Sequence, residues 1–246
     1  MALELYLDLV SQPCRAVYIF AKKNNIAFDF KRVELMQGDE GQHKAEKFLK
    51  EVNPAGKVPA MKDADFALSE SIAILLYLAR KFKTADHWYP SDLQTRARVD
   101  EYLAWQHTGV RMTASKVFLA KALIPVFLGH PLPPEKLEAA AKDLDETLAL
   151  FEAKFLQDRP FIAGRQASLA DLVAIVELMQ PVAAGHNIFE SRPKMAAWRS
   201  RVEDAVGKEL FQEAHKALLS AKDLSADLLP PEMKEKLKET ILKYIN

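Results

Sequence analysis

The chain has 246 residues, of which 49% are hydrophobic and 28% are charged, and its 34 basic side chains balance 34 acidic ones. This composition is typical of a globular protein, and it argues against a nucleic-acid partner or an anionic membrane surface. No apolar run reaches the length of about 18 residues that a membrane span needs, the N-terminus lacks a basic signal-peptide region, and one cysteine cannot form an internal disulfide. We therefore expect a cytoplasmic protein without a membrane partner.

The first third of the chain predicts a small α/β unit. Leucines alternate with polar residues from residue 3 to residue 9, as in a half-buried strand, and after Pro13 the apolar positions take helical spacing as far as Asn24. Further strands are expected at 28–35, from Val58 and at 66–68, followed by an apolar helix from about 69 to 82. This order makes the first two strands parallel and the last two an antiparallel hairpin, which is the thioredoxin-like arrangement.

One residue of this unit does not fit a regular strand. Pro59 cannot donate a hydrogen bond to a sheet, so we expect it at an edge or a turn, with a cis peptide bond as one option. In thioredoxin-like folds a cis-proline faces the start of the first helix, which is where Ser11 lies in this sequence.

The rest of the chain predicts only helices. One apolar stripe (Val99, Leu103, Gln106 and Val110) indicates a long helix that also carries Arg111, and residues 168–179 are so apolar that we expect a central buried helix. Ser168 and Asp171 are spaced as a capping box at its start. Further helices are expected at 194–206, 208–219 and, as an amphipathic segment, 230–245. We divide the chain into a thioredoxin-like domain at 1–82, a linker at 83–91 and an all-helical domain at 92–246.

The segment SQPC (residues 11–14) is the first candidate site. Ser11 is placed to cap the helix that follows, but a hydroxyl at a helix N-terminus can equally donate a hydrogen bond to an anion. In redox thioredoxins the corresponding segment is C-x-P-C, so Ser11 stands where the attacking thiolate would be. A serine without a nearby base is a poor nucleophile and is better suited to hold the thiolate of a ligand. Cys14 is expected to be a packing residue, with thiol catalysis as the alternative.

A second group of residues could bind the ends of a peptide-like anion. Ser71 and the helix N–H groups could grip a carboxylate, and Glu70 could bind an ammonium group, although Ser71 could also be only a helix cap. The backbone around Lys57 and Val58 could pair with a peptide strand. His43 lies in a polar loop and could also be simply solvated.

Four segments of the sequence, 4–24, 53–63, 69–82 and 97–108, resemble the theta-class glutathione transferases. The resemblance implies a cytosolic homodimer that conjugates reduced glutathione to small electrophiles such as alkyl halides and epoxides, with peroxide reduction as a side activity. It implies that Ser11 stabilises the glutathione thiolate, that His43, Lys57 and Val58 contact the tripeptide backbone and glycyl end, and that Glu70 and Ser71 hold the γ-glutamyl end. It also places Arg111 near the electrophile pocket, with the C-terminal helix over it, although the residue alone could be a solvated helix position. We expect Met112 in the wall of the same pocket.

Two other functions remain open at this stage. The fold could serve as a carrier module with a vestigial glutathione site, or the protein could be a thiol transferase that depends on Cys14. The sequence contains none of the glycine-rich phosphate-binding motifs and no HExxH, and its six histidines show no metal-ligand spacing. We therefore expect neither a metal nor a nucleotide as cofactor.

Overall fold

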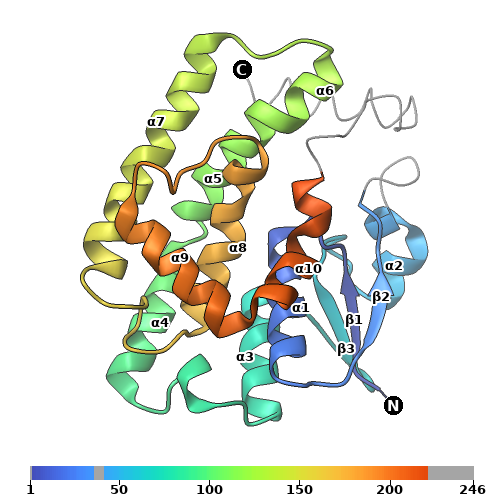
Figure 1. Cartoon of the computed structure of the whole chain (residues 1–246). Helices are drawn as coiled ribbons and strands as arrows, with labels where there is room; N and C mark the ends of the chain where they lie inside the picture. Colours follow the sequence, from blue (N-terminus) through green and yellow to red (C-terminus); the bar gives the residue numbers. More distant parts are fainter. Residues whose placement is uncertain (1, 36–41, 221–246) are drawn as a thin grey trace.

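The computed structural model describes residues 2–35 and 42–220 (Figure 1). The described chain begins with a four-stranded sheet and the helices that cover it. Their bounds are β1 (Glu4–Leu7), α1 (Gln12–Lys23), β2 (Asp29–Arg32), α2 (Glu46–Glu51), β3 (Ala60–Asp63), β4 (Phe66–Ser69) and α3 (Ser71–Lys81).

The sheet has the order β2-β1-β3-β4 and confirms the expected thioredoxin-like arrangement. β1 and β2 are parallel, with Leu5 opposite Phe30, while β3 runs antiparallel to both β1 and β4. The Val58–Pro59 peptide bond is cis and lies immediately before β3. In the β3–β4 hairpin, β3 lies beside β1, and β4 leads into α3.

Side chains of β1 point alternately to the two faces of the sheet, and each face is covered by helices. Leu5 and Leu7 point into the main core with α1 and α3, whereas Tyr6 points to the opposite face and meets Phe48 of α2 edge-on, with ring centroids 6.1 Å apart. Figure 1 shows α2 on one side of the strands and α1 and α3 on the other. This layering leaves the N-terminal ends of α1 and α3 at one edge of the unit.

From residue 92 to residue 220 the described chain contains helices and no strand, as the sequence predicts. The α-helices are α4 (Leu93–Trp105), α5 (Val110–Phe118), α6 (Ile124–Leu128), α7 (Pro134–Leu150), α8 (Leu169–Ala183), α9 (Pro193–Val206) and α10 (Lys208–Leu219). Within the described residues no helix has the length and apolar character needed to cross a membrane. The helix expected at 230–245 lies outside the described residues.

One prediction for this part is wrong. The apolar stripe predicted a single helix running through residue 110, but α4 ends at Trp105 and α5 begins at Val110. The Arg111 N–H donates to the Gln106 carbonyl five residues back, at 2.9 Å, so the intervening turn is wider than an α-helical turn. Both helices keep apolar residues on the same side, which is why the periodicity alone did not reveal the break.

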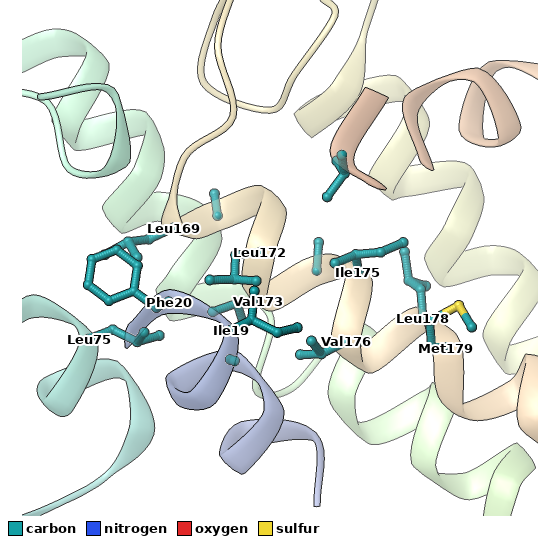
Figure 2. Close-up of a cluster of buried hydrophobic side chains, with 14 of the residues drawn as sticks. Ile19, Phe20, Leu75, Leu169, Leu172, Val173, Ile175, Val176, Leu178 and Met179 are labelled. Atoms are coloured by element: carbon teal, nitrogen blue, oxygen red, sulfur yellow. The ribbon is translucent and has the colours of Figure 1, made fainter. Parts of the chain in front are cut away.

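The central helix α8 joins the two parts of the molecule. Figure 2 shows its apolar side chains, among them Leu172, Val173 and Val176, against Ile19 and Phe20 of α1. The expected capping box is present at its start. The Asp171 carboxylate accepts hydrogen bonds from the Ser168 N–H and hydroxyl and from the Trp198 indole, each at about 3 Å. A single continuous core therefore spans the sheet unit and the helical part.

Candidate active site

A cleft of about 200 Å³ opens between the sheet unit and the helical part. It brings together the start of α1, the loop before β3, the start of α3 and the turn between α4 and α5. Its lining residues are Pro13, Asn53, Lys57, Val58, Pro59, Glu70, Ser71, His107 and Arg111. Five of the eight residues expected from the sequence line this one cleft: Lys57, Val58, Glu70, Ser71 and Arg111.

Ser11 occupies the N-cap position of α1, but its side chain does not cap the helix. Its backbone is extended, at φ −78° and ψ 127°, and its N–H donates to the Asp8 carbonyl at 3.0 Å. The Asp8 carboxylate fixes this loop by accepting from the N–H groups of Val10 and Leu35 at 2.9 and 3.0 Å. Ser11 is half-buried and does not itself line the cleft, whereas Pro13 does. Its hydroxyl accepts no hydrogen bond from the helix N–H groups and instead interacts with the Cys14 thiol. The N-terminus of the helix itself favours an anion.

Glu70 and Ser71 meet the cleft at the N-terminus of α3. Glu70 has φ +70°, a left-handed conformation that costs a residue other than glycine on the order of 1–3 kcal/mol. Such strain persists where the surrounding fold requires it and is frequent at binding sites. Ser71 is the first residue of α3 and is buried. An exposed carboxylate and a helix N-terminus therefore lie side by side.

The loop before β3 is held by the buried side chain of Asn53. Its amide nitrogen donates to the Lys57 carbonyl at 2.9 Å, and its oxygen accepts from the Ala55 N–H at 3.0 Å. With the cis bond before Pro59, these contacts present Lys57 and Val58 to the cleft. Asn53 is not among the residues singled out from the sequence, which does not reveal this supporting role.

The break between α4 and α5 supplies the opposite wall. Arg111 reaches the cleft while its Nη1 lies 3.2 Å from Oε1 of Glu177, which is fully buried. His107 lines the same wall, and partial burial, followed by the nearby Arg111, lowers its pKa. His107 was missed in the sequence, although its spacing of four residues from Arg111 would have indicated a shared side of the chain.

Besides Ser11, two further expected residues do not line the cleft. His43 is half-buried in a 3-10 turn (Gln42–Lys44), where burial lowers its pKa. Met112 is 53% exposed on α5. In residues 2–35 and 42–220 no three His, Cys, Asp or Glu side chains gather in a way that could hold a metal ion.

Cys14 is buried inside α1 and not presented to the cleft. Burial raises the pKa of its thiol to about 12, against smaller lowering contributions from the Ser11 hydroxyl and the Asp8 backbone. A thiol of this kind is protonated at neutral pH and inaccessible, so it is a poor nucleophile. These properties agree with a packing role and argue against a Cys14-dependent reaction.

Comparison with known proteins connects this fold and cleft to one family. Residues 6–80 match the N-terminal domain model of glutathione S-transferases, and residues 117–205 match the C-terminal domain model. Glutathione S-transferase theta-3 of Mus musculus is 59% identical over 241 residues, which is 98% of each chain.

Two solved human structures match the fold over nearly its whole length. The apo form of human glutathione S-transferase T1-1 has a TM-score of 0.92 and 57% identity, and the match covers 99% of this chain and 100% of that one. A human theta-class glutathione transferase in complex with the glutathione conjugate of 1-menaphthyl sulfate has a TM-score of 0.90 and 50% identity, with both chains fully covered.

The chain therefore belongs to the glutathione S-transferase family, and its similarity to theta-class glutathione transferases over the full length identifies it as an enzyme of glutathione conjugation. Within that family it is a theta-class protein, as identities above one half over the full length show. The resemblance noted in the sequence is confirmed, and the carrier alternative is not supported.

Proposed function

We propose that the cleft between α1, the loop before β3 and α3 binds glutathione, and that the Ser11 hydroxyl donates a hydrogen bond to its thiolate. The observation that carries this proposal is the gathering of Lys57, Val58, Glu70 and Ser71 in one cleft beside the start of α1. The binding of a glutathione conjugate by the related human theta-class enzyme supports it. We also include His43 among the proposed glutathione contacts, at the glycyl end of the tripeptide.

The chemistry of these groups matches the two ends of the tripeptide. Glu70 pairs with the ammonium of the γ-glutamyl group, and Ser71 with the first N–H groups of α3 binds its carboxylate. Lys57 pairs with the glycyl carboxylate, and the backbone at Val58 bonds the central peptide. The sulfur then lies near Ser11, at the positive end of the α1 dipole.

Activation of the thiol is the main catalytic contribution. Lowering its pKa from about 8.5 to between about 6 and 7 requires about 3 kcal/mol, which one charge-assisted hydrogen bond and the helix dipole can supply. The thiolate then displaces the halide ion of an alkyl halide, or it opens an epoxide whose oxygen takes a proton from water. With a peroxide, two glutathione molecules are oxidised to the disulfide while the peroxide is reduced to an alcohol and water. Arg111 and Met112 border the electrophile, which the cleft holds next to the sulfur.

The remaining assignments belong to the same proposal. We place the glutathione-binding domain at 1–82, a linker at 83–91 and the electrophile-binding domain at 92–246. The protein acts in the cytoplasm as a homodimer, without a metal or nucleotide, as the theta-class relationship suggests.

The decisive experiment is an ultraviolet titration of glutathione bound to the wild type and to Ser11→Ala. We expect thiolate absorbance at neutral pH in the wild type and its loss in Ser11→Ala, with the rate of conjugation falling by about a hundredfold because a donor to the developing anion is removed. Glutathione should still bind, since its two ends are held elsewhere.

Cys14→Ala is the matched control, because it lies three residues from Ser11 in the same helix turn. It should leave the thiolate band and the conjugation rate unchanged. If bound glutathione titrates as free glutathione does in both the wild type and Ser11→Ala, the serine is not the thiolate stabiliser. Loss of conjugation in folded Cys14→Ala would instead restore the thiol transferase hypothesis.

A further inference from the structure

A buried carboxylate interrupts the apolar surface of α8. Glu177 is 1% exposed and lies between Val176 and Leu178, whose side chains Figure 2 shows within the hydrophobic cluster. Its Oε1 accepts from Arg111, whereas its Oε2 is buried without a hydrogen-bond partner among the described residues. An ionisable group in such surroundings is costly, so a fold that needs only packing would place an apolar residue there.

The first cation near Glu177 is Arg15 of α1, which is completely buried. Its Nη1 donates to the carbonyls of Leu9 and Val10 at 2.9 and 2.8 Å, and its Nη2 donates to the carbonyl of Val176 at 3.0 Å. Arg15 thereby fastens the loop that precedes Ser11 to the backbone of α8. Because its hydrogen bonds end on backbone carbonyls, its charge is balanced through space, chiefly by Glu177 and to a smaller extent by Asp8.

The second cation is Arg111 of α5, which faces the cleft. Its guanidinium has one end on the buried carboxylate, while the side chain as a whole remains 36% exposed. A long side chain of this kind has several rotamers in solution, and a buried hydrogen-bond partner selects one of them. The carboxylate is therefore placed to determine where the positive charge of Arg111 lies in the cleft.

We propose that Glu177 is a positioning residue that aims Arg111 at the electrophile, while Arg15 balances its charge and ties the same point of α8 to the Ser11 loop. This inference rests on the proposed function, because it takes the electrophile to lie between Ser11 and Arg111. Glu177 itself touches neither glutathione nor electrophile. Its effect is on the rate with bound electrophile and not on glutathione binding.

The titratable groups around Glu177 and Arg15 come from four helices. Arg111 of α5 and Arg15 of α1 favour its ionised form, Tyr102 of α4 is buried near it, and His215 of α10 lies near Arg15. Burial is the largest influence and raises the pKa of Glu177 to about 7, against the lowering effect of the two arginines. The positioning contact is consequently strongest above neutral pH.

A double-mutant cycle between Glu177→Gln and Arg111→Met tests this inference. The glutamine keeps the shape of the side chain but removes its charge, so Arg111 is no longer fixed. We expect kcat/KM for an epoxide at saturating glutathione to fall about tenfold or more, because misplacing a group at the reacting centre is costly. The KM for glutathione and its thiolate absorbance should stay as in the wild type.

The coupling between the two substitutions in kcat/KM distinguishes a positioning role of Glu177 from a purely structural one. If Glu177 acts through Arg111, adding Glu177→Gln to Arg111→Met should change kcat/KM by less than about twofold. If the effects of the two substitutions on kcat/KM multiply in the double variant, the proposal is overturned. A folded Glu177→Gln variant with unchanged kcat/KM would overturn it too. The control is Glu152→Gln, which breaks the half-buried ion pair between Glu152 and Arg192 (2.8 Å) away from the cleft and should not alter kcat/KM.

A second measurement keeps the inference testable if Glu177→Gln does not fold. In the wild type, kcat/KM at saturating glutathione should fall as the pH drops through about 7, beyond any loss explained by the separately measured thiol titration. Arg111→Met should lack that additional step, and its persistence in Arg111→Met would contradict the proposal. Failure of Ser11→Ala to lose the thiolate would refute the proposed role of Ser11 but leave this coupling measurable.

Discussion

His215 illustrates how a buried ionisable side chain couples the stability of this protein to pH. It is completely buried in α10, its Nδ1 bonds the Phe211 carbonyl at 2.8 Å, and its ring stacks on that of Phe211 with centroids 4.2 Å apart. Because a carbonyl only accepts, Nδ1 carries the proton, and Nε2 is buried without a partner among the described residues. Burial, followed by the nearby Arg15, lowers the pKa of His215 to about 3.

The folded protein therefore holds His215 neutral, whereas the unfolded chain protonates it below its ordinary pKa of 6.5. The free energy of unfolding should fall as the pH drops below 6.5, by about 2 kcal/mol at pH 5 for this residue alone. His215→Gln should lose this part of the pH dependence, although it is less stable than the wild type at pH 7. Urea unfolding between pH 5 and pH 8 measures it.

The control substitution for His215→Gln is made at His130, which is exposed. His130→Gln should keep the wild-type dependence of stability on pH. An unchanged slope in His215→Gln would show that other groups cause the acid destabilisation.

At the level of elements, the turn between α4 and α5 depends on one glycine. A Cβ atom at Gly109 would lie 2.6 Å from two carbons of the Trp105 indole. That indole cannot move away freely, because it packs on Phe155 with ring centroids 4.5 Å apart. The close approach of backbone to ring is thus possible only without a side chain at residue 109, and this approach sets the positions of His107 and Arg111.

Gly109→Ala should therefore affect both stability and activity. Overpacking against the indole should lower the free energy of unfolding by about 1–3 kcal/mol. The conjugation rate should also fall, since the wall that bears Arg111 is displaced. Chemical denaturation and steady-state kinetics measure the two effects, and Gly164→Ala, which would meet no atom within 4 Å, is the matched control. Wild-type kinetics in Gly109→Ala would show that the wall does not depend on this turn.

The sequence predicted those elements whose signals are local. Alternating leucines marked β1, Pro13 marked the start of α1, and the Ser168–Asp171 spacing marked the start of α8. It could not predict the partners of Glu177, because Arg111 lies 66 residues away along the chain and meets it only after the helices pack. The same holds for Asn53 and His107, whose side chains acquire a role only when separate segments close the cleft.

On the scale of the whole molecule, the sheet unit and the helical part share one hydrophobic core. Ile19 of α1 and Leu172 of α8 are both buried in it, and Figure 2 shows them close together with Phe20 and Val173. Neither part covers its apolar surface without the other. We therefore expect the two parts to unfold together, in spite of their different architectures.

Ile19→Ala tests this expectation. It should lower the free energy of unfolding by about 2–5 kcal/mol and keep a single transition. Far-ultraviolet circular dichroism and tryptophan fluorescence, compared at one protein concentration, should give coincident curves. Leu93→Ala, at a residue that is 77% exposed, should change stability little. Separate transitions for the two probes would mean that the parts fold independently.

The hydrogen bonds by which Arg15 joins the two parts do not depend on the side chains of its partners. Its bond to α8 ends on the carbonyl of Val176, and its bonds to the Ser11 loop also end on carbonyls. Any amino acid presents the same acceptor, so substitutions at residues 9, 10 and 176 need not be matched by a change at Arg15. Covariation between sequences would therefore miss this contact, and a chimaera that combines halves of two related enzymes can preserve it if Arg15 and the path of the α8 backbone are retained.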